Sequence, residues 1–195
     1  MGLRWLTLNC PNAKAVLNID DDVFVNIFRV VKVWLPLISQ NPNQFLCAHH
    51  PKVTERIIRK GGGKWEVDDT LFPGLDYFPF DACSGFFVLY SGQLAKRMLA
   101  ASHVTPFFWI DDFYMYGLLP VTLGGADFQE IDYQITWYDY EEIDNCLREK
   151  GVDCELSVFL EFREHYFYEQ RKYKLWSVIE DLFTRPNETS QNSVK

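Results

Sequence analysis

The run AVLNIDDDVFVN, residues 15–26, joins two apolar segments through three adjacent aspartates. Its first part, residues 15–19, has the length and apolar content of a buried strand. Side chains alternate between the faces of a strand, so we expect Asp20 and Asp22 to share one face about 6.6 Å apart, with Asp21 on the other. Because the aspartates follow the carboxyl end of this strand, they stand where open α/β sheets bind ligands.

Two interpretations of the aspartates are open. In the first, one aspartate caps the helix that follows and the others are solvated. In the second, the acids hold a cation, because two ionised carboxylates at this spacing repel by roughly 2.5 kcal/mol at an effective dielectric of ~20 and a divalent ion reverses that sign. Three acids in a row favour the cation, and their oxygen ligands favour Mg²⁺ or Mn²⁺ over zinc.

A second acidic pair, Asp111 and Asp112, interrupts the aromatic run PFFWIDDFYMYGLL at the expected start of a helix. Such acids alone are usually helix caps. Together with the triplet they supply what metal-assisted transfer chemistry needs, namely one group to hold the ion and another to remove a proton. Between the two clusters, Ser84 and Gly85 form a small-residue turn that allows close backbone approach to a ligand.

The histidines carry less weight. His165 precedes an amphipathic helix, and a lone histidine is more often a surface or packed residue than a ligand. His49 and His50 follow a strand and precede Pro51, so we interpret them as loop residues.

Helical and strand patterns alternate along the chain, which predicts an α/β domain with a sheet covered by helices. We expect one domain over residues 1–183 and a polar, flexible tail over 184–195. The expected helices are residues 1–8, 26–38, 92–102, 112–119, 140–149 and 166–183, and the expected strands are 15–19, 44–48, 85–91, 128–135 and 156–159.

Composition narrows the classes of partner. The chain has 195 residues, is 48% hydrophobic and carries a formal net charge of −8, which argues against binding nucleic acid or an anionic membrane. No segment approaches the ~20 apolar residues of a membrane span. The first ten residues resemble the late part of an amphipathic helix without a cap, so we expect that the natural start is missing. Five cysteines fit either reduced core thiols or two disulfides with one cysteine left over.

These motifs together resemble the β-1,3-glycosyltransferases, the family of galactosyl- and N-acetylglucosaminyltransferases that includes the Fringe enzymes. The matching stretches, in order, are RWLTLNC, AKAVLNIDDDVFVN, GGKWEV, YFPFDACSG leading into FFVLYS, and WIDDFYMYG. The resemblance implies a GT-A fold with a mixed sheet flanked by helices, incomplete on its amino-terminal side. It also implies a UDP-sugar donor, a glycan acceptor, Mn²⁺ or Mg²⁺, and inversion at the anomeric carbon.

The resemblance implies roles for particular residues. Asp22 would bind the metal and His165 would complete its shell, while Asp20 and Asp21 help to hold the nucleotide. Asp112 would be the general base. Further contacts are expected from Ser84 and Gly85 to the donor, and from Trp65 and Asp111 to the acceptor or sugar.

Several positions depart from the family pattern. Asn18 replaces a lysine and Phe87 replaces a glycine, and either change could narrow or weaken the donor pocket. A non-catalytic binding or scaffold protein derived from the same fold is therefore the alternative hypothesis, and a Mg²⁺-dependent hydrolase is a third. If the enzyme hypothesis holds, the resemblance places the protein in the Golgi lumen, anchored to the membrane through a segment outside this chain, and Asn187 begins a usable glycosylation sequon.

Overall fold

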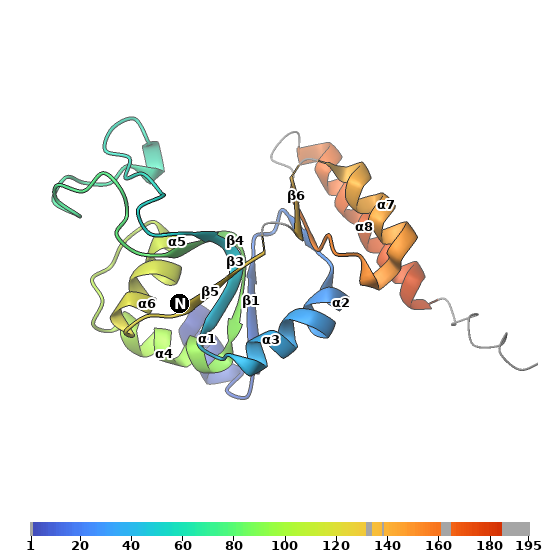
Figure 1. Cartoon of the computed structure of the whole chain (residues 1–195), viewed down its shortest axis with the longest axis horizontal. Helices are drawn as coiled ribbons and strands as arrows, with labels where there is room; N and C mark the ends of the chain where they lie inside the picture. Colours follow the sequence, from blue (N-terminus) through green and yellow to red (C-terminus); the bar gives the residue numbers. More distant parts are fainter. Residues whose placement is uncertain (1, 132–133, 138, 161–164, 185–195) are drawn as a thin grey trace, which may run out of the picture. The chain divides into compact units, whose positions relative to one another are not determined.

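The chain forms two compact units, which we describe separately. The computed structural model describes residues 2–131, 134–137, 139–160 and 165–184 (Figure 1). Unit 1 contains Met1–Asp20 and Trp34–Asp132, and unit 2 contains Asp21–Val33 and Tyr133–Lys195. The expected single domain over residues 1–183 stays a prediction, and the expected tail lies almost entirely outside the described residues.

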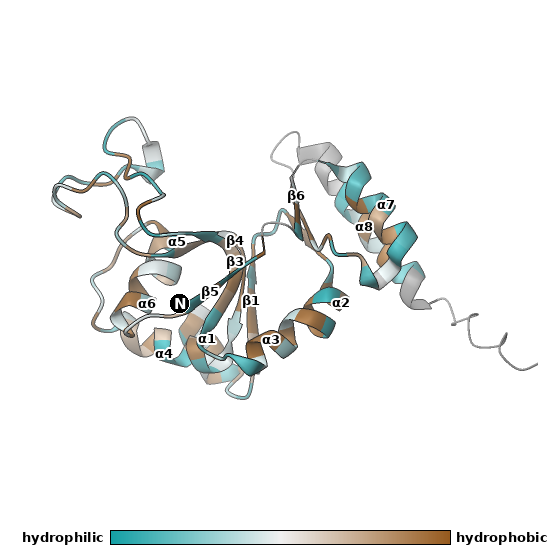
Figure 2. Cartoon of the chain, in the orientation of Figure 1, coloured by the Kyte–Doolittle hydropathy of each residue, from teal (hydrophilic) through white to brown (hydrophobic). Residues whose placement is uncertain are grey.

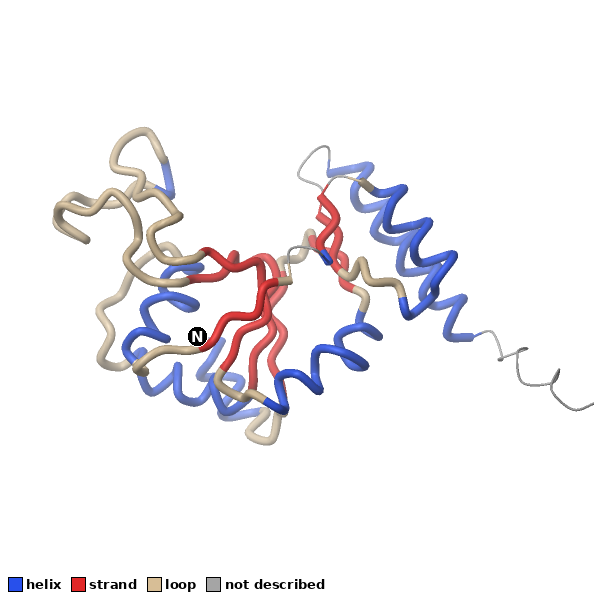
Figure 3. Tube along the Cα trace, viewed as in Figure 1, coloured by secondary structure: helices blue, strands red, loops and turns tan. Residues whose placement is uncertain are grey.

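Unit 1 is built on a mixed four-stranded sheet in the order β1-β4-β3-β5 (Figure 3). Its strands are β1 (Ala15–Ile19), β4 (Ala82–Ser91), β3 (Gln44–His50) and β5 (Asp127–Glu130). The pairs β1/β4 and β4/β3 are antiparallel, whereas β3 and β5 are parallel. The α/β class and the mixed sheet expected from the sequence are confirmed.

Helices cover both faces of this sheet (Figure 1). On one face, α3 (Leu35–Gln40) packs on β3 and β4, and the ring of Trp34 meets that of Phe87 edge-on at 5.2 Å. On the other face, α1 (Gly2–Asn9) and α4 (Gly92–Ser102) share a core with the strands. The hydropathy of α3 and of the strands matches this burial (Figure 2).

A separate apolar cluster lies under the long loops of unit 1. Its buried members are Ile57, Val67, Phe78, Phe80, Phe108 and Ile110. The guanidinium of Arg59 holds the loop from the outside by donating hydrogen bonds to the carbonyls of Asp68, Leu71, Phe72 and Leu75. The loop between β3 and β4 is therefore ordered, with one short 3₁₀ turn, η2 (Gly63–Trp65).

Two of the expected helices widen into π-helical turns. The first consists of α2 (Ile27–Arg29), η1 (Val30–Trp34) and α3, and the second of α5 (Asp111–Phe113), η3 (Tyr114–Leu118) and α6 (Leu119–Thr122). In each case a proline, Pro36 or Pro120, follows two residues after the π segment. Proline has no N–H to continue the i→i−4 pattern, which accounts for the local rearrangement.

Unit 2 contains a three-stranded sheet in the order β2-β7-β6. Its strands are β2 (Val23–Val25), β7 (Val158–Leu160) and β6 (Ile135–Trp137), and its helices are α7 (Tyr140–Lys150) and α8 (His165–Thr184), with η5 (Gly151–Asp153) between α7 and β7. The carboxylate of Asp139 caps α7 by accepting from the Glu142 N–H at 3.0 Å. The strand expected over residues 128–135 is wrong as one element, because β5 and β6 belong to different sheets.

Two disulfides are present, Cys47–Cys83 in unit 1 and Cys146–Cys154 in unit 2. Cys10 is free and exposed. Of the two alternatives open from the sequence, two disulfides with one cysteine left over is therefore the correct one. None of the helices in the described part of the chain is long and apolar enough to cross a membrane.

Candidate functional site

The aspartate triplet lies at the end of β1 and leaves the strand. β1 ends at Ile19, the Asp20 N–H donates to the Phe86 carbonyl at 3.1 Å, and Asp21 and Asp22 form a turn. The expectation that Asp20 and Asp22 share a strand face is therefore wrong. The chain turns here because the next strand, β2, pairs with β7 in the other sheet.

Strand β4 carries a bulge beside Asp20. Between the pairs Cys47↔Val88 and His49↔Cys83, β3 advances by two residues and β4 by five. The extra residues of β4 include Ser84 and Gly85, the small-residue turn expected from the sequence. Bulges occur often beside active sites, where they redirect side chains.

Asn18 secures one edge of the bulge. Its side-chain amide on β1 donates to the Gly85 carbonyl at 3.0 Å. The departure at Asn18 thus has a structural role, and the second departure, Phe87, is fully buried against Trp34.

Asp112 lies against the bulge. A Cβ built on Gly85 would stand 2.1 Å from Asp112 Oδ1, so glycine is needed for this approach. Burial is the main cause that raises the pKa of Asp112, and the negative charges of Asp111 and Asp20 add to it. A hydrogen bond from the Gly85 backbone and the proximity of His50 act in the opposite direction on this pKa. Gly85 thus approaches Asp112 directly, and Asp20 and Asp111 are close enough for their charges to act on Asp112, while the roles of these residues stay predictions.

His50 joins this group, although the sequence predicts a loop at this position. His49 and His50 are the last residues of β3, so that interpretation is wrong. His50 Nε2 is 2.6 Å from Ser84 Oγ, and His50 Nδ1 is 3.0 Å from Glu55 Oε1. The His50 ring centroid is also 6.3 Å from that of Phe113, the residue after Asp112.

His49 has a different set of partners. Its Nε2 is 2.9 Å from Asp81 Oδ1, and its ring stacks on Phe128 at 4.8 Å. The two adjacent histidines thus serve separate contacts. The signal in the sequence that places both histidines in the strand is the uninterrupted run QFLCAHH, which has the same bounds as β3.

The remaining predicted residues lie elsewhere. Trp65 ends η2, is 42% exposed and has Lys64 Nζ 4.5 Å from its ring centroid. No contact found among the described residues joins it to Asp112. Asp21 and Asp22 belong to unit 2, where Lys172 Nζ donates to the Asp21 carbonyl at 2.7 Å. His165 begins α8, and its side chain is outside the described part.

The described residues include no group of three His, Cys, Asp or Glu side chains that could hold a metal by themselves. Asp22 offers a half-buried carboxylate on its turn. Mg²⁺ is usually bound by one or two carboxylates together with substrate phosphates and waters, not by an all-protein cage. The donor set therefore fits an ion that is held jointly with a phosphate ligand.

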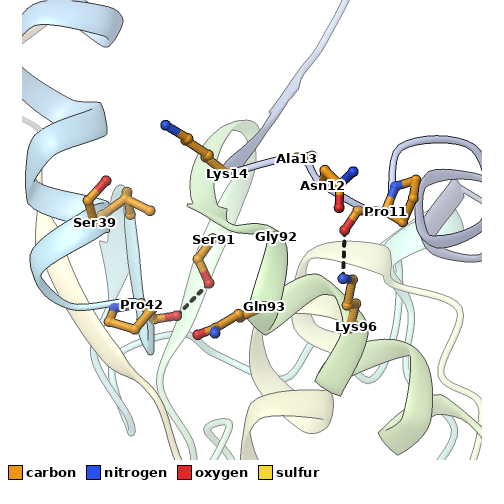
Figure 4. Close-up of a pocket in the computed structure, with 11 residues that line it drawn as sticks. Pro11, Asn12, Ala13, Lys14, Ser39, Pro42, Ser91, Gly92, Gln93 and Lys96 are labelled. Atoms are coloured by element: carbon orange, nitrogen blue, oxygen red, sulfur yellow. Dashed lines mark hydrogen bonds between the residues drawn. The ribbon is translucent and has the colours of Figure 1, made fainter.

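A hollow of about 490 Å³ lies at the opposite end of β1 (Figure 4). It is bordered by the loop before β1, the end of α3 and the start of α4. Its polar side chains are partly engaged with the backbone, since Lys96 Nζ donates to the Pro11 carbonyl and Ser91 Oγ to the Pro42 carbonyl. It contains no acidic residue and is distinct from the group around Asp112.

Comparison with known proteins identifies the family of the chain. Residues 1–126 match the family model described as galactosyltransferase, and the chain belongs to that family. It is 40% identical to the human acetylgalactosaminyl-O-glycosyl-glycoprotein beta-1,3-N-acetylglucosaminyltransferase over 113 residues. These residues cover 58% of this chain and 28% of the relative. It is 30% identical over 129 residues to mouse beta-1,3-galactosyltransferase 1, covering 66% of this chain and 38% of the relative.

The chain thus spans well under half the length of these relatives. The matched family region contains β1, the aspartate triplet, the bulge of β4 and Asp112. The resemblance to β-1,3-glycosyltransferases expected from the sequence is confirmed.

Proposed function

We propose that this protein is an inverting, metal-dependent glycosyltransferase of GT-A fold. It transfers a hexose, galactose or N-acetylglucosamine, from a UDP-sugar to a glycan hydroxyl in β-1,3 linkage, during the glycosylation of protein or lipid. The observation that carries the proposal is the half-buried Asp112, whose pKa is raised and whose carboxylate lies on Gly85 beside Asp20. A base with a raised pKa removes a hydroxyl proton more effectively than an ordinary aspartate does.

The proposed reaction is a single displacement that uses one base, Asp112. The Asp112 carboxylate takes the proton of the acceptor hydroxyl while that oxygen forms a bond to the anomeric carbon. The bond from the anomeric carbon to the diphosphate breaks in the same displacement, and UDP leaves with the electron pair. A single displacement inverts the anomeric centre, and it requires no second carboxylate as nucleophile.

The other residues bind and orient the substrates in this proposal. Asp20 and Asp21 hold the nucleotide, Ser84 and Gly85 contact the donor, and Asp111 with Trp65 contacts the acceptor. Asp22 and His165 hold Mn²⁺ or Mg²⁺, which when bound offsets the negative charge of the leaving diphosphate.

We propose the Golgi lumen as the compartment, with the full-length protein anchored in the membrane. The two disulfides support an oxidising compartment, because disulfides are rare where glutathione keeps thiols reduced. The relatives are named as β-1,3-N-acetylglucosaminyl- and β-1,3-galactosyltransferases, which supports the proposed β-1,3 transfer.

Transfer activity tests the proposal. The protein is incubated with Mn²⁺, UDP-galactose or UDP-N-acetylglucosamine and a panel of glycan acceptors. We expect Asp112→Asn to lower kcat by about 10²- to 10⁴-fold, the usual contribution of a general base, without loss of donor binding. Asp153→Asn, a change at an exposed carboxylate of unit 2, is the control.

Three results would contradict the proposal. Full transfer by Asp112→Asn would remove the assigned base. Donor binding without transfer to any acceptor would favour the non-catalytic binding protein. Release of phosphate in the absence of acceptor would favour a hydrolase.

A further inference from the structure

Ser84, His50 and Glu55 form a continuous hydrogen-bonded chain that the proposed reaction does not use. His50 stands between the other two, with its Nε2 2.6 Å from Ser84 Oγ and its Nδ1 3.0 Å from Glu55 Oε1. Ser84 and Gly85 are adjacent in the bulge, and Gly85 supports Asp112. This series of hydrogen bonds therefore ends at Ser84, the residue next to Gly85, whose backbone contacts the proposed base Asp112.

The carboxylate of Glu55 determines which nitrogen of His50 carries the proton. An ionised carboxylate only accepts hydrogen bonds, so His50 Nδ1 is the protonated nitrogen. In neutral His50 the Nε2 atom is then an acceptor, and the Ser84 hydroxyl donates to it. The His50 and Glu55 side chains are 30% and 44% exposed, so their pairing contributes little to stability and mainly sets the orientation of the ring.

The hydrogen bond that the Ser84 hydroxyl donates to neutral His50 limits which ligand groups Ser84 can recognise. While His50 is neutral, the only O–H of Ser84 is directed to His50 Nε2, and Ser84 Oγ has only lone pairs left for a ligand. Lone pairs accept from a hydroxyl, but they repel a phosphate oxygen. We propose that Ser84 recognises a sugar hydroxyl by accepting its hydrogen bond, and that His50, oriented by Glu55, is a positioning residue for this contact. This proposal rests on the proposed function and assigns Ser84 to the sugar, not to the diphosphate.

The same geometry could suggest that Ser84 is a nucleophile, since Ser–His–acid chains activate serine in hydrolases. The surroundings argue against this role. Nucleophilic attack by serine on a carbonyl needs hydrogen-bond donors for a developing oxyanion. Next to Ser84, the Gly85 backbone donor is engaged by the negative carboxylate of Asp112.

Calorimetric titration in Mn²⁺ with UDP, UDP-galactose and UDP-N-acetylglucosamine tests the proposal. We expect Ser84→Ala to weaken binding of the preferred UDP-sugar by about 3- to 10-fold, as for one lost hydrogen bond, and to leave UDP binding unchanged. Ser84→Thr keeps the hydroxyl and is expected to retain most of the affinity. His50→Ala should act in the same direction and have no further effect once Ser84 is alanine.

His49→Ala is the matched control, because His49 is the neighbouring residue on β3 and pairs with Asp81 instead. It should leave the ratio of UDP-sugar to UDP affinity unchanged. Alternatively, Ser84→Ala leaves the ratio of UDP-sugar to UDP affinity unchanged and instead raises the KM for an acceptor p-nitrophenyl glycoside at constant kcat. That result would assign the contact to the acceptor sugar. Both results support recognition of a sugar hydroxyl.

Three outcomes would overturn the proposal. Equal loss of UDP and UDP-sugar affinity in Ser84→Ala would place the contact at the phosphates. No change in donor affinity or acceptor KM would remove the contact altogether, and labelling of Ser84 by a fluorophosphonate probe would make it a nucleophile. Wild-type protein that binds no UDP-sugar would instead contradict the proposed function itself, before any variant is compared.

Discussion

The Asp112 carboxylate rests on the backbone of Gly85, so closely that a methyl group at residue 85 would stand 2.1 Å from Asp112 Oδ1. Gly85 lies in the bulge of β4 and Asp112 in the first turn of α5. The contact therefore connects the sheet to the helix that carries the proposed base.

Gly85→Ala should move Asp112 without unfolding the protein. The atom that a new Cβ would meet belongs to the end of a side chain, which can rotate away. We expect kcat to fall by about 10²-fold, as for a catalytic group displaced by about 1 Å. Gly2→Ala, where a Cβ meets nothing within 4 Å, is the control. Activity close to wild type in Gly85→Ala would show that the position of Asp112 is not limiting.

The activity should depend on pH through Asp112. A general base must be deprotonated, and the pKa of Asp112 is raised from 3.8 by burial and by the charges of Asp111 and Asp20. We expect kcat/KM to rise with pH and to level off above this raised pKa. The profile of kcat/KM against pH measures it. The residual activity of Asp112→Asn should lack this rise, and an identical profile in that variant would assign the rise to another group.

The effect of Asp112 on the stability of the protein should change with pH in the opposite direction to its effect on activity. A carboxyl whose pKa is higher in the folded than in the unfolded state favours folding below its unfolded pKa, and this contribution is lost as the pH rises through the folded value. Ionised Asp112 is thus unfavourable for folding at neutral pH. We expect Asp112→Asn to unfold at a higher temperature than wild type at pH 7, and this difference to shrink as the pH falls toward about 4. Thermal unfolding followed by circular dichroism provides the measurement, and a lower melting temperature at pH 7 would contradict it.

Removal of the Cys47–Cys83 disulfide should destabilise unit 1. The two cysteines are 36 residues apart in the sequence, and both are fully buried. We expect Cys47→Ala to cost about 2–4 kcal/mol of the free energy of unfolding. Cys10→Ser is the matched control, because Cys10 is free and exposed. Urea unfolding of both variants distinguishes the two cases, and equal midpoints would be inconsistent with the disulfide.

Gly92 marks a second close approach, at the hollow shown in Figure 4. A Cβ on Gly92 would stand 1.9 Å from the Ala13 carbonyl oxygen, and the Gly92 N–H donates to the Lys14 carbonyl at 3.1 Å. Since the obstacle is the backbone of the loop before β1, that loop and the start of α4 must separate. We expect Gly92→Ala to lower the free energy of unfolding by about 1–3 kcal/mol, measured by urea unfolding. A wild-type midpoint would show that the junction can adjust.

Periodicity and local composition identified most elements of the fold. The strand at Ala15–Ile19 and the helix at Gly92–Ser102 have the predicted bounds, because their apolar spacing and the Ser91 cap are local signals. The strand β2 was not anticipated. Its three residues are stabilised by pairing with β7, more than a hundred positions later, which no local pattern reports.

The candidate site was predictable to the extent that its residues form short motifs. Asp112 and Gly85 each stand in a recognisable stretch of sequence, whereas His50 does not. The partners of His50 are determined by the pairing of β3 with β4 and by the bulge in that pairing. Pro51, directly after His50, favours a loop, so the local sequence does not place His50 in the strand.

The disulfide of Cys83 has a practical consequence, because Cys83 is the residue directly before Ser84 in the bulge. Protein made in the reducing cytosol of a bacterial expression host would lack this covalent brace next to Ser84, the residue that we propose contacts the sugar. Recombinant preparations for enzymology therefore call for oxidative folding, in a secretory host or the periplasm.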